Sequence, residues 1–216
     1  PEFPELQFVV TNGVTGQDNI SSIKIDYYEL GYVACSLACE MTKTGKIGIV
    51  QGELIPILMD SEAACRQALE SDHCGKDVEL FTVATGSWED VAKAREASLA
   101  LIADGVDVLW QNLDTADAGV FSAAEDKGVF AIGQYVIQSN LGPKAYIGSP
   151  AGSPTTLVYE AACGNVPKGE IVYMGVNTPN GVDVIMSDLV PPETQEKLRG
   201  VIEDMRSGKI EVIKTR

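Results

Sequence analysis

The 216-residue chain carries 31 acidic against 16 basic side chains, a formal net charge of −15, and 45% of its residues are hydrophobic. This length and composition allow a sizeable core, formed as one large domain or as two smaller lobes. The negative charge repels phosphate backbones, which argues against nucleic acid as a partner. No apolar run approaches the length of a membrane-spanning helix, and residues 1–4 show no signal-peptide pattern, so we expect any targeting segment to lie outside this chain.

The residue types that carry most catalytic and metal chemistry are sparse. Five cysteines form an odd set that cannot all pair internally, and no Cys-x-x-Cys occurs. Cys35 and Cys39 lie among Ala and Leu on a predicted helix, and we interpret the cysteines as small buried apolar residues. His73 is the only histidine and is expected in a solvated loop, and no nucleophile-elbow sequence is present. We therefore predict neither an enzyme nor a metal or cofactor site.

The predicted elements alternate between strands and helices along most of the chain. A turn-rich segment at 11–16 follows the first strand, and prolines at 191 and 192 begin the last helix. Hydrophobic periodicity predicts strands over 6–10, 46–50, 77–84, 106–110, 129–132, 146–149 and 169–176, and helices over 28–41, 60–71, 91–102, 155–163 and 192–205.

The segment 105–133 shows this alternation most clearly, as one strand, loop, helix and strand. Asp114 or Thr115 can cap the helix, and Gly128 stands where a C-terminal stop belongs. A crossover helix between two strands implies a parallel pair with a right-handed connection. The whole pattern predicts a doubly wound α/β architecture, with the loops 52–56, 86–90, 111–117 and 134–138 gathered at the ligand-binding edge of the sheet.

Several motifs in order make a family resemblance specific. They are MTKTGKIG at 41–48, GSW at 86–88, QNLD at 111–114, EDKGVFAIG at 125–133 and GPKA at 142–145. The chain resembles the basic membrane protein family, which comprises substrate-binding proteins of ABC importers. The resemblance implies a type I periplasmic-binding-protein fold with doubly wound parallel sheets in two lobes. Several members are similar to purine nucleoside or nucleobase binders, so the resemblance implies a ligand of that kind.

The same resemblance implies a domain layout with an incomplete first lobe. Residues 1–45 are expected to be its remnant, 46–149 the second lobe, 150–176 a return to the first lobe and 177–216 a C-terminal helix on the second. Family members carry on the order of a hundred further residues ahead of the first strand, a domain-sized segment. A first-lobe sheet of only two strands, 6–10 and 169–176, leaves edges open, so we also predict possible self-association there.

The resemblance locates a ligand pocket at which this chain departs from the family pattern. Gly133-Gln134-Tyr135-Val136-Ile137-Gln138 stands where the family has Gly-x-Asp-x-Asp-Gln, and no lysine follows Ser149. We therefore expect weak nucleoside binding. Trp88 could equally be a core residue and Asp114 only a helix cap. Aromatic walls and polar anchors make these the candidate ligand-binding residues: Trp88, Asn112, Asp114, Gln134, Tyr135 and Gln138.

Two functions of different class follow from these observations. The first is a substrate-binding protein of an ABC importer, extracytoplasmic, which takes a small polar, ring-containing, nucleobase-like solute in an interlobe cleft and delivers it to a membrane permease or sensor. The alternative is a structural or assembly protein that keeps the fold without ligand binding.

Overall fold

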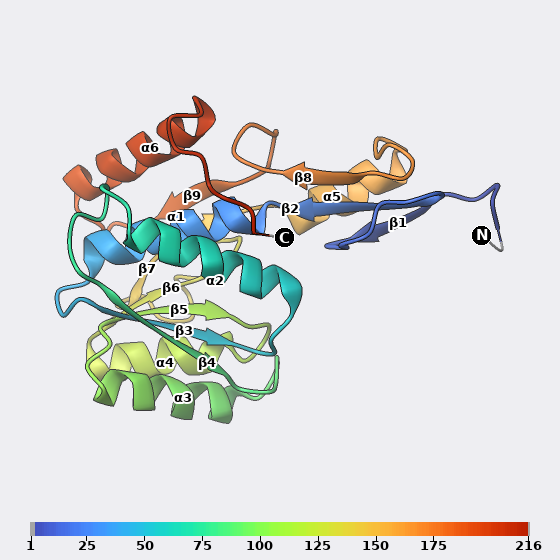
Figure 1. Cartoon of the computed structure of the whole chain (residues 1–216). Helices are drawn as coiled ribbons and strands as arrows, with labels where there is room; N and C mark the ends of the chain where they lie inside the picture. Colours follow the sequence, from blue (N-terminus) through green and yellow to red (C-terminus); the bar gives the residue numbers. More distant parts are fainter. Residues whose placement is uncertain (1–2, 216) are drawn as a thin grey trace.

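Two β-sheets organise the chain, and the computed structural model describes residues 3–215 of it (Figure 1). The smaller sheet has three parallel strands in the order β1-β2-β8. The larger sheet has six strands in the order β4-β3-β5-β6-β7-β9, in which β9 runs antiparallel to β7. The strands are β1 (Phe8–Thr11), β2 (Ile20–Ile25), β3 (Lys46–Gln51), β4 (Glu79–Ala84), β5 (Val108–Asn112), β6 (Phe130–Ile132), β7 (Tyr146–Ala151), β8 (Ile171–Met174) and β9 (Asp183–Met186).

Helices cover both faces of the larger sheet. Figure 1 shows α3 and α4 on one face and α1 and α2 on the other, with α6 beyond α1. A separate apolar core lies on each face, which confirms the doubly wound α/β class. The fifth helix, α5, packs against β1 and β2 of the smaller sheet. The helices are α1 (Tyr27–Met41), α2 (Pro56–Leu69), α3 (Val91–Ala103), α4 (Asp117–Lys127), α5 (Pro154–Ala162) and α6 (Pro192–Arg206).

The unit β5-α4-β6 forms as predicted, except at the start of its helix. Val108 of β5 pairs in parallel with Phe130 of β6, and Gly128 ends α4 with a left-handed φ of 68°. Neither Asp114 nor Thr115 caps the helix, because α4 begins after Ala116 without a side-chain cap. The backbone carbonyl of Asp114 instead accepts a hydrogen bond from the Asp117 N–H, so the Asp114 carboxylate is not used by the helix.

Two strands escaped the sequence prediction, and one of them is central to its sheet. In β2, buried polar side chains interrupt the apolar pattern, because Ser21 and Ser22 donate to the carbonyls of Pro167 and Thr15 over 2.8 and 2.5 Å. The other is the four-residue edge strand β9. The smaller sheet therefore has three strands, and the prediction of only two was wrong.

The chain leaves the smaller sheet earlier than expected. The carboxylate of Asp26, directly after β2, caps α1 by accepting the Glu29 N–H over 3.3 Å. Helix α1 then packs on α2 and on β5, β6, β7 and β9 of the larger sheet. The assignment of residues 1–45 to the first lobe stays a prediction, while the chain passes from the smaller to the larger sheet near Asp26.

The edge strand β1 keeps one apolar side uncovered. Phe8 and Val10, two residues apart and so on one side of the strand, are 44% and 45% exposed. Self-association through this edge stays a prediction.

Helices α1 and α2 are joined unusually closely. A Cβ on Gly31 would lie 2.1 Å from the Ser61 carbonyl oxygen, so only glycine allows this approach. Disulfides connect Cys35 with Cys65 and Cys39 with Cys74, while Cys163 is free and exposed. Cys35 and Cys39 are buried, as interpreted from the sequence, and their pairing in disulfides is a finding that the sequence pattern did not indicate. Cys35 and Cys39 lie one helical turn apart and so face the same neighbour.

Charged side chains link the two sheets at the crossing. Lys24 of β2 forms a 3.5 Å ion pair with Asp60 of α2, and the two side chains are 4% and 5% exposed. Near the C-terminus, Lys214 pairs with the carboxylate of Asp26 over 2.5 Å. Both lysine ammonium groups lie over the ring of Tyr173 in β8, at 5.0 and 4.2 Å from its centroid. Attraction between these groups holds the smaller sheet against α1 and α2.

Removing one disulfide should destabilise the α1–α2 pair. Because the Cys39–Cys74 bond closes a 35-residue separation, we expect the double substitution Cys39→Ser/Cys74→Ser to lower the free energy of unfolding by about 2–4 kcal/mol. Urea unfolding measures it, and Cys163→Ser is the matched control that should change nothing. Thiol titration of the unfolded, unreduced chain should find one thiol; five thiols would contradict the assignment.

The carboxyl of Glu29 should make stability pH-dependent. Burial raises the pKa of Glu29, and the negative charge of Asp26 raises it further. The Glu29 carboxylate accepts a 2.6 Å hydrogen bond from the Val176 N–H. A raised folded-state pKa stabilises the fold below the ordinary glutamate value of about 4.3, and this contribution is lost as the pH rises through the folded pKa.

We therefore expect Glu29→Gln to flatten the fall in melting temperature as the pH rises above about 4.3. Glu196→Gln, on the solvent face of α6, should leave that fall unchanged. Parallel pH profiles for wild type and Glu29→Gln would contradict the expectation.

Candidate functional site

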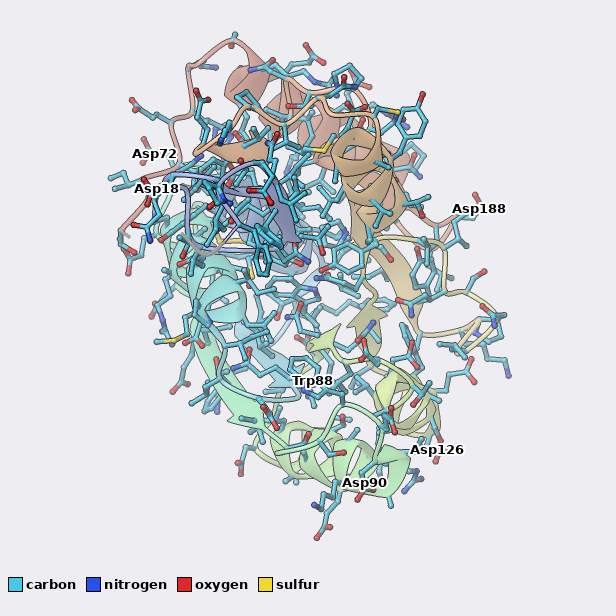
Figure 2. The ribbon with its side chains drawn as sticks, turned by 90° about the vertical axis from the view of Figure 1, so that its right-hand side faces the viewer. Asp18, Asp72, Trp88, Asp90, Asp126 and Asp188 are labelled. Atoms are coloured by element: carbon cyan, nitrogen blue, oxygen red, sulfur yellow. A yellow bond between two sulfur atoms is a disulfide. The ribbon has the colours of Figure 1, made fainter. Side chains whose placement is uncertain are left out.

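The loops after β3, β4, β5 and β6 converge on one pocket between the two sheets. Its volume is about 310 Å³, which suits a small solute. The smaller sheet contributes Asn12 at the end of β1, and Pro154 begins α5 on the same side. Figure 2 looks toward this edge of the larger sheet and shows Trp88 on it. The lining comprises Asn12, Tyr27, Ile55, Ile57, Leu58, Trp88, Asn112, Leu113, Asp114, Gln134, Tyr135 and Pro154.

Trp88 is both a wall of the pocket and a support for the next loop. Its ring lies against the backbone of Gly52, where a Cβ would come within 2.4 Å of the ring atom Cδ2. Its carbonyl accepts hydrogen bonds from the N–H groups of Asp114 and Ala116 over 3.2 and 3.1 Å. The β4–α3 loop thereby fixes the conformation of the loop after β5.

Asn112 ends β5 and contributes a carboxamide that is 3% exposed. Neither its Oδ1 nor its Nδ2 has a hydrogen-bond partner within residues 3–215. Buried polar atoms in folded proteins are nearly always hydrogen-bonded, and leaving one without a partner costs free energy. Both a donor and an acceptor thus remain for a molecule in the pocket.

Asp114 supplies the charge of the site. Its backbone is held by Trp88, whereas its carboxylate is exposed and forms no hydrogen bond or ion pair with any residue of the described part of the chain. No lysine or arginine is among the residues that line the pocket in residues 3–215. The site therefore favours neutral or cationic groups over anions.

The loop after β6 brings in Tyr135 and Gln134. Tyr135 has a left-handed φ of 63°, a conformation that is costly for a bulky residue and concentrates at functional sites. Its hydroxyl bonds that of Tyr27 over 2.7 Å, and burial raises the pKa of both phenols, so the pair is neutral. Gln134 accepts a 3.3 Å hydrogen bond from the Trp110 indole N–H.

Gln138 does not line the pocket, unlike the five other sequence-predicted residues. Its Oε1 accepts hydrogen bonds from Gln111 Nε2 and from the Gln134 N–H over 3.0 and 2.8 Å, and its Nε2 donates to Asp117 over 2.5 Å. Burial raises the pKa of Asp117. Gln138 thus supports the loop after β6 through these hydrogen bonds, and its expected ligand contact stays a prediction.

Sequence reasoning missed three residues of this region. Asn12 stands in a turn-rich segment, and Tyr27 opens a helix that was expected to belong to the first lobe. Gln51 lies beside Asn112 at the end of β3, because the two residues are partners in the parallel ladder. A polar residue that ends an apolar strand is a signal that could have identified Gln51.

A second hollow, of about 370 Å³, lies between α1 and α6. Three of its charged groups are already paired: Lys197 lies 2.9 Å from Glu40, and Asp204 lies 2.7 Å from Lys209 outside the hollow. This hollow therefore leaves fewer polar groups free for a ligand than the pocket between the two sheets does. Within residues 3–215, no group of three or more His, Cys, Asp or Glu side chains is placed to hold a metal ion.

Comparisons with known proteins agree with this architecture. The chain is 29% identical over 133 residues to a purine-binding protein of Brucella abortus, covering 62% of this chain and 37% of that protein. It is 23% identical over 211 residues to the transcriptional activator protein med of Bacillus subtilis, covering 94% and 63%. Basic membrane protein A2 of Borrelia garinii is 24% identical over 160 residues. The chain spans less than two thirds of the length of these relatives.

Solved structures show the same fold, and a family model matches the chain throughout. A solute-binding protein of an Aeropyrum pernix ABC transporter system superposes with a TM-score of 0.80 at 20% identity, over 100% of this chain and 73% of that one. A transcriptional activator of the comK gene from Bacillus halodurans gives 0.75 at 26% identity, over 97% and 73%. The family model of PnrA-like ABC transporter substrate-binding proteins matches residues 1–216, so the chain belongs to that family, as its resemblance to basic membrane proteins indicated.

Proposed function

We propose that the chain binds a small, uncharged, polar and ring-containing solute, nucleobase-like in shape, in the pocket between its two sheets. The observation that carries this proposal is the buried Asn112 carboxamide without a protein partner, which lines the same pocket as the Trp88 ring. A planar ring gains contact area against an aromatic wall, and its polar edge supplies the missing hydrogen bonds. The relative named as a purine-binding protein supports this size and shape of ligand.

The partner in this proposal is the permease of an ABC importer, to which the chain delivers its solute. Membership of a family of substrate-binding proteins supports a binding role over an enzymatic one. The two disulfides support an extracytoplasmic location, since such bonds persist in oxidising compartments. No helix within residues 3–215 combines the length and apolar character needed to cross a bilayer.

Replacing the aromatic wall should weaken binding more than it weakens the fold. We expect Trp88→Ala to reduce affinity for a bound nucleobase by about 10-fold or more, because stacking on an aromatic ring contributes roughly 1–3 kcal/mol per base. The affinity of Trp88→Phe should lie between those of wild type and Trp88→Ala. Isothermal titration calorimetry with hypoxanthine and uracil measures the change.

Tyr159→Ala is the matched control, since Tyr159 is an exposed aromatic residue on α5, 63% accessible, and does not line the pocket. It should bind as wild type does. If no nucleobase binds the wild-type chain at millimolar concentration, the proposed function is wrong.

Nucleosides should bind weakly. The acids that the family pattern places after Gly133 are replaced by Tyr135 and Ile137, and no lysine follows Ser149, so sugar hydroxyls lose charged partners. Each lost charge-assisted hydrogen bond is worth roughly 1.5–3 kcal/mol. Calorimetry with inosine and guanosine tests this, and sub-micromolar affinity for either would refute it.

A further inference from the structure

Gln51 and Asn112 are neighbours on adjacent strands and their side chains share one face. They are partners in the parallel β3–β5 register, so their side chains project to the same side of the sheet. Along each strand the residues two positions earlier, Ile49 and Trp110, are buried in the core beneath α1 and α2. The two carboxamides therefore continue that buried face to its carboxyl edge, where Asn112 reaches the pocket.

Both carboxamides lack protein partners. Gln51 is 0% exposed, and neither its Oε1 nor its Nε2 has a hydrogen-bond partner within residues 3–215, as is true of Asn112. Their backbones are paired normally, since the Gln51 carbonyl accepts the Thr85 N–H over 2.8 Å and the Asn112 carbonyl accepts the Gly52 N–H over 3.2 Å. Of these two residues, only the side chains therefore lack hydrogen bonds within residues 3–215.

The neighbouring residue Gln111 shows that buried carboxamides at this edge of the sheet do not generally lack hydrogen-bond partners. Gln111, one residue before Asn112 on the opposite face, is equally buried, yet its Nε2 donates to Gln138 and its Oε1 accepts the Leu113 N–H over 2.9 Å. Of these four buried polar atoms, the two of Asn112 belong to a pocket-lining residue, and the two of Gln51 belong to its partner on the adjacent strand. Such atoms are costly without a hydrogen-bond partner.

We infer that Gln51 and Asn112 together determine the specificity of the proposed binding site, by reading a ligand edge that carries a hydrogen-bond donor beside an acceptor. A carboxamide presents C=O and N–H side by side, which matches such an edge in a two-bond pairing. A lactam edge of a planar heterocycle has this pattern, and the aromatic lining with no basic side chain suits a neutral planar ring. This inference rests on the proposed function. It adds that Gln51 and Asn112 select the ligand and that the ligand presents a lactam edge.

The test combines binding with the stability of the ligand-free chain. The variants are Asn112→Leu and Gln51→Met, which keep side-chain shape and remove the polar atoms. The probes are uracil and hypoxanthine, which carry lactam edges, pyrimidine, which has the same six-membered ring as uracil without an N–H, and ribose. Calorimetry gives affinities, and calorimetric melting gives Tm.

We expect wild type to prefer uracil or hypoxanthine over pyrimidine, and each variant to lose roughly 10- to 100-fold of that affinity. The ligand-free Tm of both variants should rise, because buried polar atoms without partners are removed. Gln111→Met is the matched control; its hydrogen bonds are complete, so its Tm should fall.

Other outcomes separate the failure of the inference from that of the proposed function. Unchanged lactam affinity in both variants overturns the inference while leaving solute binding intact. A fall in Tm for both variants shows that the amides serve the fold and also overturns it. If the chain binds ribose and not the lactam probes, the inferred recognition of a lactam edge is wrong. If it binds none of the probes, the proposed function itself is wrong.

Discussion

The close packing of α1 on α2 is the constraint on which both sides of the pocket depend. Helix α1 starts at Tyr27 and α2 starts at Pro56, immediately after Ile55, so both helices begin at the pocket. Gly31 permits the contact, the Cys35–Cys65 disulfide joins the two helices, and the Cys39–Cys74 disulfide joins α1 to the segment after α2. Because each helix is fixed against the other and against the sheet, their first residues have little freedom to move. The part of the pocket lining that lies at the starts of α1 and α2 thus depends on this helix pair for its position.

The residues that support the loops of the site have complete hydrogen bonds, whereas the carboxamides of Asn112 and Gln51 have none within residues 3–215. Gln138 ties the β6 loop to Gln111 and Asp117, and the Trp88 carbonyl ties the β5 loop to the β4 loop. These bonds set the positions of Trp88 and Tyr135 without using the atoms that face the cavity. A binding protein needs this division, since a ligand gains affinity only from groups that are positioned beforehand and not already engaged.

Local patterns made the larger sheet predictable, whereas pairings distant in sequence were not. The unit from β5 to β6 follows from an apolar strand, a helical apolar spacing and Gly128. The strand-end rule likewise placed Trp88, Asn112 and Tyr135 on one pocket. Strand β2 was hidden because its buried serines bond backbone carbonyls outside the strand, at Thr15 in the preceding loop and at Pro167 far along the chain. The disulfides were hidden because spacing alone does not show which helix faces which.

The ion pair between Lys24 and Asp60 bears on how the two sheets could move apart. One partner belongs to β2 and the other to α2, and each side chain is almost fully enclosed. Separation would leave two opposite charges in surroundings of low polarity until solvent entered, and the hydration of each charge would then offset the lost attraction. Any separation of the two sheets at this crossing would therefore require water to reach both the Lys24 and the Asp60 side chains.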